Sequence, residues 1–68
     1  MAARTYICTV SNDNTEDRQY FVRSRSAMAC AKEYGRTNDT ITVRTTNGQI
    51  LSRVKWDEQT KKYINVSF

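Results

Sequence analysis

The sequence has no histidine and no proline, and it contains only two glycines and two cysteines among 68 residues. Without histidine, acid–base catalysis would fall to carboxylates, Lys, Tyr or Cys, and the usual zinc ligand sets are incomplete. Two glycines, Gly35 and Gly48, are too few for a glycine-rich phosphate-binding loop. We therefore expect no catalytic residues, no cofactor and no metal, and predict that the protein is not an enzyme.

The two cysteines and the apolar segments constrain the compartment. Cys8 and Cys30 lack metal-ligand spacing, and although they could form one bridge we interpret them as reduced core residues. No segment approaches the ~20 apolar residues of a membrane span, and the first residues lack the apolar core of a signal peptide. We expect a cytoplasmic protein that is not membrane-embedded.

Chain length and net charge further restrict the class of protein. Without a linker, a repeat or a low-complexity tract, residues 1–68 should form a single domain. A chain this short buries only roughly 60% of its unfolded surface, so a deep cleft is not expected. Eleven Lys and Arg against seven Asp and Glu leave a net charge of +4. This excess favours polyanions or acidic protein surfaces as partners, although a merely soluble basic domain has the same composition.

The first third of the chain has the pattern of two strands. Residues 4–11 and 18–23 alternate and are rich in β-branched and aromatic side chains, and the polar residues between them predict a turn. In the second segment Tyr20 and Val22 lie on one side and Phe21 on the other. One aromatic side chain should therefore stay at least partly exposed.

Residues 24–35 change to a helical period. Their apolar side chains follow the spacing i, i+3, i+4 and i+7, in Ala27, Cys30, Ala31 and Tyr34. Ser24 or Ser26 can cap the first turn, and Gly35 can end the helix in a left-handed conformation. The small residues of the apolar stripe would let this helix sit close to a sheet.

The dipeptide Asn47-Gly48 predicts a two-residue type I′ hairpin turn, in which Thr46 faces Gln49 and Val43 faces Ser52. Period-two alternation then assigns one side of the hairpin to the core, with Ile41, Val43, Ile50, Val54 and Trp56. The opposite side carries Thr42, Arg44, Leu51, Arg53 and Lys55.

Residues 63–68 form a last strand. If Val54 pairs with Ile64, the core face gains Ile64, Val66 and Phe68, and the opposite face gains Tyr63 beside Lys55. The expected architecture is an α+β fold in the order ββαβββ. It has an antiparallel sheet of about five strands and one helix packed on one face.

The face opposite the core is a candidate nucleic-acid-binding surface. Arginine forks can hold phosphates and an aromatic ring can stack on a base, which assigns this role to Arg44, Arg53, Lys55 and Tyr63. A charged solvent face is the simpler interpretation of the same residues. The carboxylates other than Glu33 fall in predicted turns, where such side chains are usually solvated.

Several landmarks extend over nearly the whole chain. They are Tyr6-Ile7 with Val10 and Asn12, a Ser-initiated helix containing Ala31-Lys32, the segment 46–48 followed by Leu51, and a lysine-rich turn before Tyr63. In this order they resemble a group of small phage anti-CRISPR proteins that inhibit the type I-F (Csy) surveillance complex. The resemblance implies a non-enzymatic inhibitor that binds a bacterial CRISPR-Cas protein–RNA complex and blocks target DNA recognition.

The resemblance also implies a binding surface. Because the backbone subunits of such a complex are positively charged, the acidic positions should face them, namely Asp13, Glu16, Asp17, Asp57 and Glu58.

Two alternatives stay open. One is a nucleic-acid-binding module acting alone, which contacts DNA or RNA through its basic face; the other is an accessory protein that binds a host factor through Phe21, Tyr20 and the sheet edge. The chain is expected to be a monomer or a weak dimer.

Overall fold

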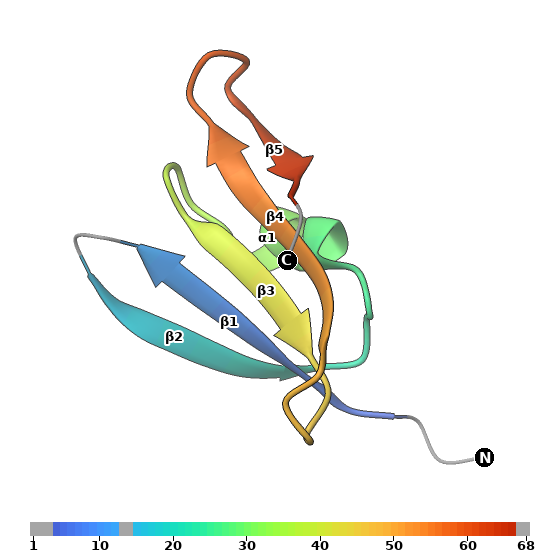
Figure 1. The fold of residues 1–68 in the computed structure, drawn as a ribbon. Helices are drawn as coiled ribbons and strands as arrows, with labels where there is room; N and C mark the ends of the chain where they lie inside the picture. The colour runs from blue at the N-terminus through green and yellow to red at the C-terminus, as the bar shows by residue number, and fades with distance from the viewer. Residues whose placement is uncertain (1–3, 13–14, 67–68) are drawn as a thin grey trace.

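Within the residues that the structure describes, the chain folds as one open antiparallel sheet of five strands with a single helix packed against it, which confirms the predicted α+β fold (Figure 1). The computed structural model describes residues 4–12 and 15–66, so Asp13 and Phe68 lie outside the described residues. The elements are β1 (Tyr6–Asn12), β2 (Thr15–Val22), α1 (Ala27–Tyr34), β3 (Thr40–Arg44), β4 (Ile50–Asp57) and β5 (Lys62–Asn65). The strand order is β2-β1-β3-β4-β5, which makes β2 and β5 the edges.

The core lies between α1 and the face of the sheet that α1 covers. Alternate residues of β1, β3 and β4 are buried there against the helix, with Ala27, Cys30 and Ala31 on the helical side. Cys8 and Cys30 are both buried and carry free thiols, in agreement with their predicted core role. Burial, followed by the neighbouring Cys30, raises the pKa of Cys8 to about 12. Both side chains therefore behave as small uncharged core groups.

Both ends of α1 are attached to the sheet. Ser26 is the N-cap and its hydroxyl accepts from the Ala29 N–H at 3.3 Å, while the Ala27 N–H donates to the Ser52 hydroxyl of β4 at 3.1 Å. The left-handed conformation expected at Gly35 was wrong, because its φ is −73°. Glycine is needed there for close approach instead: a Cβ would lie 2.7 Å from the Tyr63 hydroxyl and from the Ile41 Cδ1 atom.

The β3–β4 hairpin closes differently from the prediction. The Thr45 N–H donates to the Gln49 carbonyl at 2.8 Å, so the loop has three residues, and Gly48 is its residue with positive φ, at 96°. A three-residue loop with glycine in the left-handed region replaces the predicted type I′ turn.

A bulge in β4 restores the register that this longer loop displaces. Arg44 pairs with Ile50 instead of Leu51, and beyond this irregularity the predicted pairs Val43–Ser52, Thr42–Arg53 and Ile41–Val54 form. Leu51 packs against the core, although the prediction placed it on the opposite face and assigned Ile50 to the core side.

The register between β4 and β5 differs by one residue from the prediction. Lys55 pairs with Ile64 and Trp56 with Tyr63, so the expected pairing of Val54 with Ile64 was wrong. The turn sets this register: the Asp57 carboxylate accepts from the Gln59 N–H and the Thr60 hydroxyl, and Asp57 pairs with Lys62. A slip of one residue moves each side chain to the other face. Ile64 is consequently 44% exposed.

Asp39, in the connection that precedes β3, is buried, with 2% of its surface exposed. Its carboxylate accepts from the Arg36 N–H at 2.7 Å, from the Arg18 guanidinium at 3.1 Å and from the Asn12 amide at 2.9 Å. The expectation that turn carboxylates other than Glu33 are solvated was therefore wrong for Asp39. This carboxylate joins β1, β2 and the α1–β3 connection.

Replacing Asp39 by alanine should lower the free energy of unfolding by about 3 kcal/mol, because three donors lose their acceptor in a buried place. Asp57→Ala is the matched control, since it also removes a carboxylate that accepts two hydrogen bonds, but in an exposed turn, and should cost about 1 kcal/mol or less. Urea denaturation of both variants measures the difference. Equal losses would mean that Asp39 does not organise the sheet.

Candidate functional site

The sheet face that α1 leaves uncovered, here called the open face, carries the predicted cations. Directly paired residues on neighbouring strands share a face. The observed pairing therefore places three rows across the open face: Phe21, Ile7 and Arg44; Gln19, Thr9, Thr42 and Arg53; Ser11, Thr40, Lys55 and Ile64. Arg44, Arg53 and Lys55 are thus on one surface, as the alternation of residues 42–55 predicted.

Tyr63 does not lie on the open face, and its assignment there was wrong. Its ring packs against the core and meets Trp56 edge-on with 5.3 Å between ring centroids, and its hydroxyl donates to the Arg36 carbonyl oxygen. Burial, with the Asp39 carboxylate as the second cause, raises the pKa of Tyr63. Tyr63 is a neutral structural hydroxyl that joins β5 to the end of the helix.

Phe21 is the aromatic side chain that the open face presents. It is 79% exposed on the edge strand β2, next to Ile7 of β1. Its neighbour Tyr20 points to the helical side, where it stacks on Tyr34 with 4.2 Å between ring centroids. The predicted division of Tyr20 and Phe21 between two faces is confirmed. The sequence did not reveal which aromatic would be exposed, because that depends on the face the helix covers.

The cations of the open face differ in their surroundings. The Arg53 Nε donates to the Thr42 hydroxyl at 3.1 Å, which orients the guanidinium group. The Arg44 Nε and the Thr9 hydroxyl oxygen are covered from solvent and have no hydrogen-bond partner among residues 4–12 and 15–66. Lys55 is exposed at the end of the face. The guanidinium group of Arg53 is oriented and that of Arg44 is half-covered, and the Lys55 ammonium group has no ion-pair partner among the described residues.

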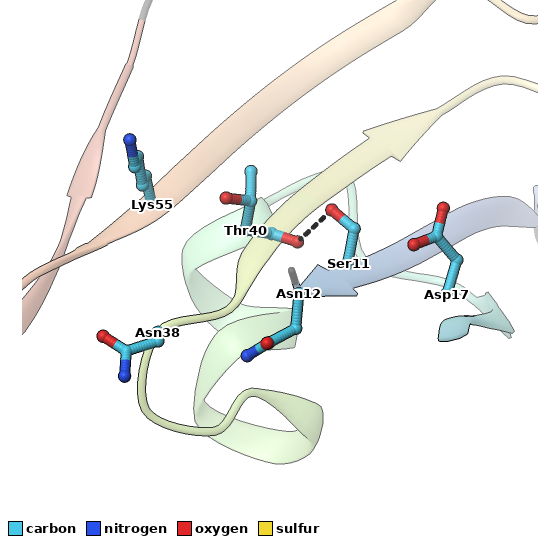
Figure 2. A pocket seen from close by; sticks show the side chains of 6 residues that line it. All are labelled: Ser11, Asn12, Asp17, Asn38, Thr40 and Lys55. Carbon is cyan, nitrogen blue, oxygen red and sulfur yellow. Dashed lines mark hydrogen bonds between the residues drawn. The ribbon is translucent and has the colours of Figure 1, made fainter. Parts of the chain in front are cut away.

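A polar hollow of about 260 Å³ adjoins Lys55, lined by Ser11, Asn12, Asp17, Asn38, Thr40 and Lys55. Figure 2 shows Lys55 and Asp17 on opposite sides of it, with the Ser11 hydroxyl donating to the Thr40 carbonyl oxygen between them. The hollow extends the open face with both hydrogen-bond donors and hydrogen-bond acceptors.

The four described acidic residues assigned to partner binding gather at one end of the sheet. Glu16 and Asp17 lie near the start of β2, and Asp57 and Glu58 lie at and just after the end of β4, so antiparallel pairing places all four at the same end of the sheet. The two pairs occupy different parts of that end, because β1 and β3 lie between β2 and β4.

These four carboxylates differ in how far they are engaged within the fold. Asp57 accepts hydrogen bonds within its own turn, and Glu58 pairs with Lys61. Hydrogen bonds to Glu58, from Lys61 first and then from Trp56, lower its pKa. Glu16 and Asp17 have no hydrogen bond or ion pair within the described part of the chain.

The described residues contain neither a cluster of metal ligands nor a membrane-spanning helix. In the part of the chain that the structure describes, no three His, Cys, Asp or Glu side chains come together as metal ligands. No helix among the same residues combines the length and the apolar character needed to cross a bilayer.

In comparisons with known proteins, no family model, no curated protein and no solved structure matches this chain. Function must therefore be argued from the geometry of the open face and of the acidic end.

Because Phe21 is exposed and Tyr20 is packed, replacing each by threonine should change the free energy of unfolding by different amounts. Phe21→Thr should change the free energy of unfolding by less than about 0.5 kcal/mol, because the ring is exposed and threonine, like phenylalanine, favours strands. Tyr20→Thr should cost about 2 to 3 kcal/mol through lost packing and stacking on Tyr34. Chemical denaturation tests both, and a large loss for Phe21→Thr would show that the ring is buried.

Proposed function

We propose that this protein binds single-stranded nucleic acid on the open face of its sheet. The observation that carries the proposal is that Arg44, Arg53 and Lys55 share one uncovered face with Phe21, which is 79% exposed. Single-strand binders combine cations that follow the phosphates with aromatic rings on which bases stack. A net charge of +4 supports attraction to such a strand.

The spacing of the face suits an extended strand that crosses the sheet. Phe21 and Arg44 stand in the same row, in strands β2 and β3 with β1 between them. Two strand spacings separate them by roughly 10 Å, so a base on Phe21 and a phosphate at Arg44 can belong to the same short segment. Stacking on a phenyl ring tolerates every base, so binding should show little sequence preference.

The proposed activity is binding without catalysis. The two thiols that could act as nucleophiles are buried, and their pKa values are raised, which keeps them uncharged. The groups that the open face offers are guanidinium, ammonium, hydroxyl and phenyl groups, and these hold a strand without cleaving it.

Reversing two charges of the open face should abolish binding. Arg44→Glu with Arg53→Glu is expected to weaken the binding of a fluorescent oligothymidylate at least about 100-fold and to reduce the salt dependence, because each lost phosphate contact removes about 0.7 from the logarithmic slope. Fluorescence anisotropy at about 50 mM and 200 mM salt measures both quantities.

The control for this experiment changes the net charge equally in another place. Arg23→Glu with Arg25→Glu alters two exposed arginines of the β2–α1 connection and should weaken binding less than about tenfold. If both pairs lose affinity equally, net charge alone drives binding and the open face is not the site.

The acidic end of the sheet favours a second candidate function. We propose that Glu16 and Asp17, with Asp57 and Glu58 at the same end of the sheet, bind the basic surface of a CRISPR-Cas surveillance complex. The chain would then act as a phage-type inhibitor of target DNA recognition in the cytoplasm of the bacterial host. Support comes from the gathering of these carboxylates at one end and from the absence of intramolecular partners for Glu16 and Asp17 among the described residues. Complementary charges across an interface mainly set specificity and association rate.

This candidate has a separate test with a purified type I-F surveillance complex. Glu16→Arg with Asp17→Arg should slow association and weaken binding at least about tenfold, as measured by biolayer interferometry. The Arg44 and Arg53 reversal should leave this binding intact. If the unmodified protein does not bind the complex, or if the acidic variant binds equally well, the inhibitor function is rejected.

A further inference from the structure

We propose that Arg44 and Arg53 form a clamp for one phosphodiester group at the centre of the open face, an inference that rests on the proposed binding of single strands. The alternative within that function is diffuse attraction, in which the three cations act as interchangeable charges. The two differ in geometry: a clamp requires guanidinium groups held in place, whereas diffuse attraction requires only charge.

The two arginines are diagonal neighbours on adjacent central strands. Arg53 of β4 pairs directly with Thr42 of β3, and Arg44 follows Thr42 by two residues on the same face. Diagonal positions in a regular ladder are about 7 to 8 Å apart, which long side chains span easily. Both guanidinium groups can therefore reach a single anion placed between them.

The Arg53 side chain is held before any ligand arrives. Its Nε donates to the Thr42 hydroxyl at 3.1 Å, and Thr42 is only 5% exposed. With Nε engaged, the four terminal N–H groups of the guanidinium remain available to an anion. Fixing a flexible arginine in advance reduces the entropy that binding would otherwise cost.

Two covered polar atoms on the same face lack partners. The Arg44 Nε and the Thr9 hydroxyl oxygen are buried and make no hydrogen bond within residues 4–12 and 15–66, and Thr9 pairs directly with Thr42. A buried donor without a partner costs about 1 to 3 kcal/mol, and in native proteins it often indicates a bound group. A phosphate supplies several acceptor oxygens, and it would satisfy the Arg44 Nε–H and the Thr9 hydroxyl once the side chains that cover these two atoms move aside.

Neither arginine of this pair has an ion-pair partner in the part of the chain that the structure describes. The ion pairs of the described residues are Arg18 with Asp39 and Lys61 with Glu58, and neither involves Arg44 or Arg53. The acidic residue lining the neighbouring hollow is Asp17, and it lies there with Lys55. An anion at the centre of the open face thus meets two guanidinium groups that no carboxylate of residues 4–12 and 15–66 neutralises.

Charge-conserving variants test the clamp. Arg53→Lys, Arg44→Lys and Thr42→Val should each weaken binding of the oligothymidylate about tenfold and leave the salt slope unchanged, because the number of cations is the same. Arg25→Lys makes the same exchange at an exposed arginine of the β2–α1 connection, outside the open face; it is the control and should bind within about twofold of the unmodified protein. The thermal midpoint of each variant is recorded, and Arg53→Lys tests the orientation of the guanidinium independently if Thr42→Val proves unstable.

The outcomes separate the clamp from the proposed function. If the lysine variants bind like the unmodified protein, the clamp is wrong while binding on the open face stands. If the unmodified protein binds no oligonucleotide, the proposed function fails. In that case a titration with inorganic phosphate, followed by the ¹⁵N–¹H signal of the Arg44 Nε, decides whether an anion site exists: a saturable shift supports the clamp and no shift overturns it.

Discussion

The buried carboxylate of Asp39 is the interaction on which the rest of the structure depends. The carboxylate accepts hydrogen bonds from β1, from β2 and from the Arg36 N–H of the α1–β3 connection. The backbone carbonyl of Asp39 accepts from the Trp56 N–H of β4 at 3.1 Å. Three strands that are distant in sequence from Asp39, namely β1, β2 and β4, therefore converge on this residue of the α1–β3 connection. In a chain this short, where the core is small, such a polar junction fixes the relative position of strands that apolar contacts alone define weakly.

That junction also decides where function can reside. With α1 held over β3 and β4, one face of the sheet becomes core and the other stays in solvent. The open face then combines exposed Phe21 with arginines whose charges have no ion-pair partner among the described residues, and the covered Arg44 Nε has no acceptor there, which is unusual in a native protein. Glu16, Asp17, Asp57 and Glu58 lie at one end of the sheet, so a basic protein surface would meet that end, whereas an anionic strand would meet the open face.

Much of the fold could be predicted because its patterns are local. The helical spacing of Ala27, Cys30, Ala31 and Tyr34 and the alternation of residues 41–54 each reflect a preference that a few neighbouring residues determine. The errors arose at turns, where one extra residue changes the outcome. A three-residue loop at Gly48 and the Asp57-capped turn each displaced a register by one, and the second displacement removed Tyr63 from the candidate site.

The sequence by itself determined the elements, their order and the gathering of Arg44, Arg53 and Lys55 on one face, because backbone periodicity alone sets these. Only the tertiary structure decided the strand order, the face that the helix covers and the burial of Asp39. It also decided that Phe21, and not Tyr63, is the aromatic side chain on the open face. Those features depend on contacts between residues far apart in the chain and on turn geometry, and neither leaves a periodic signal in the sequence.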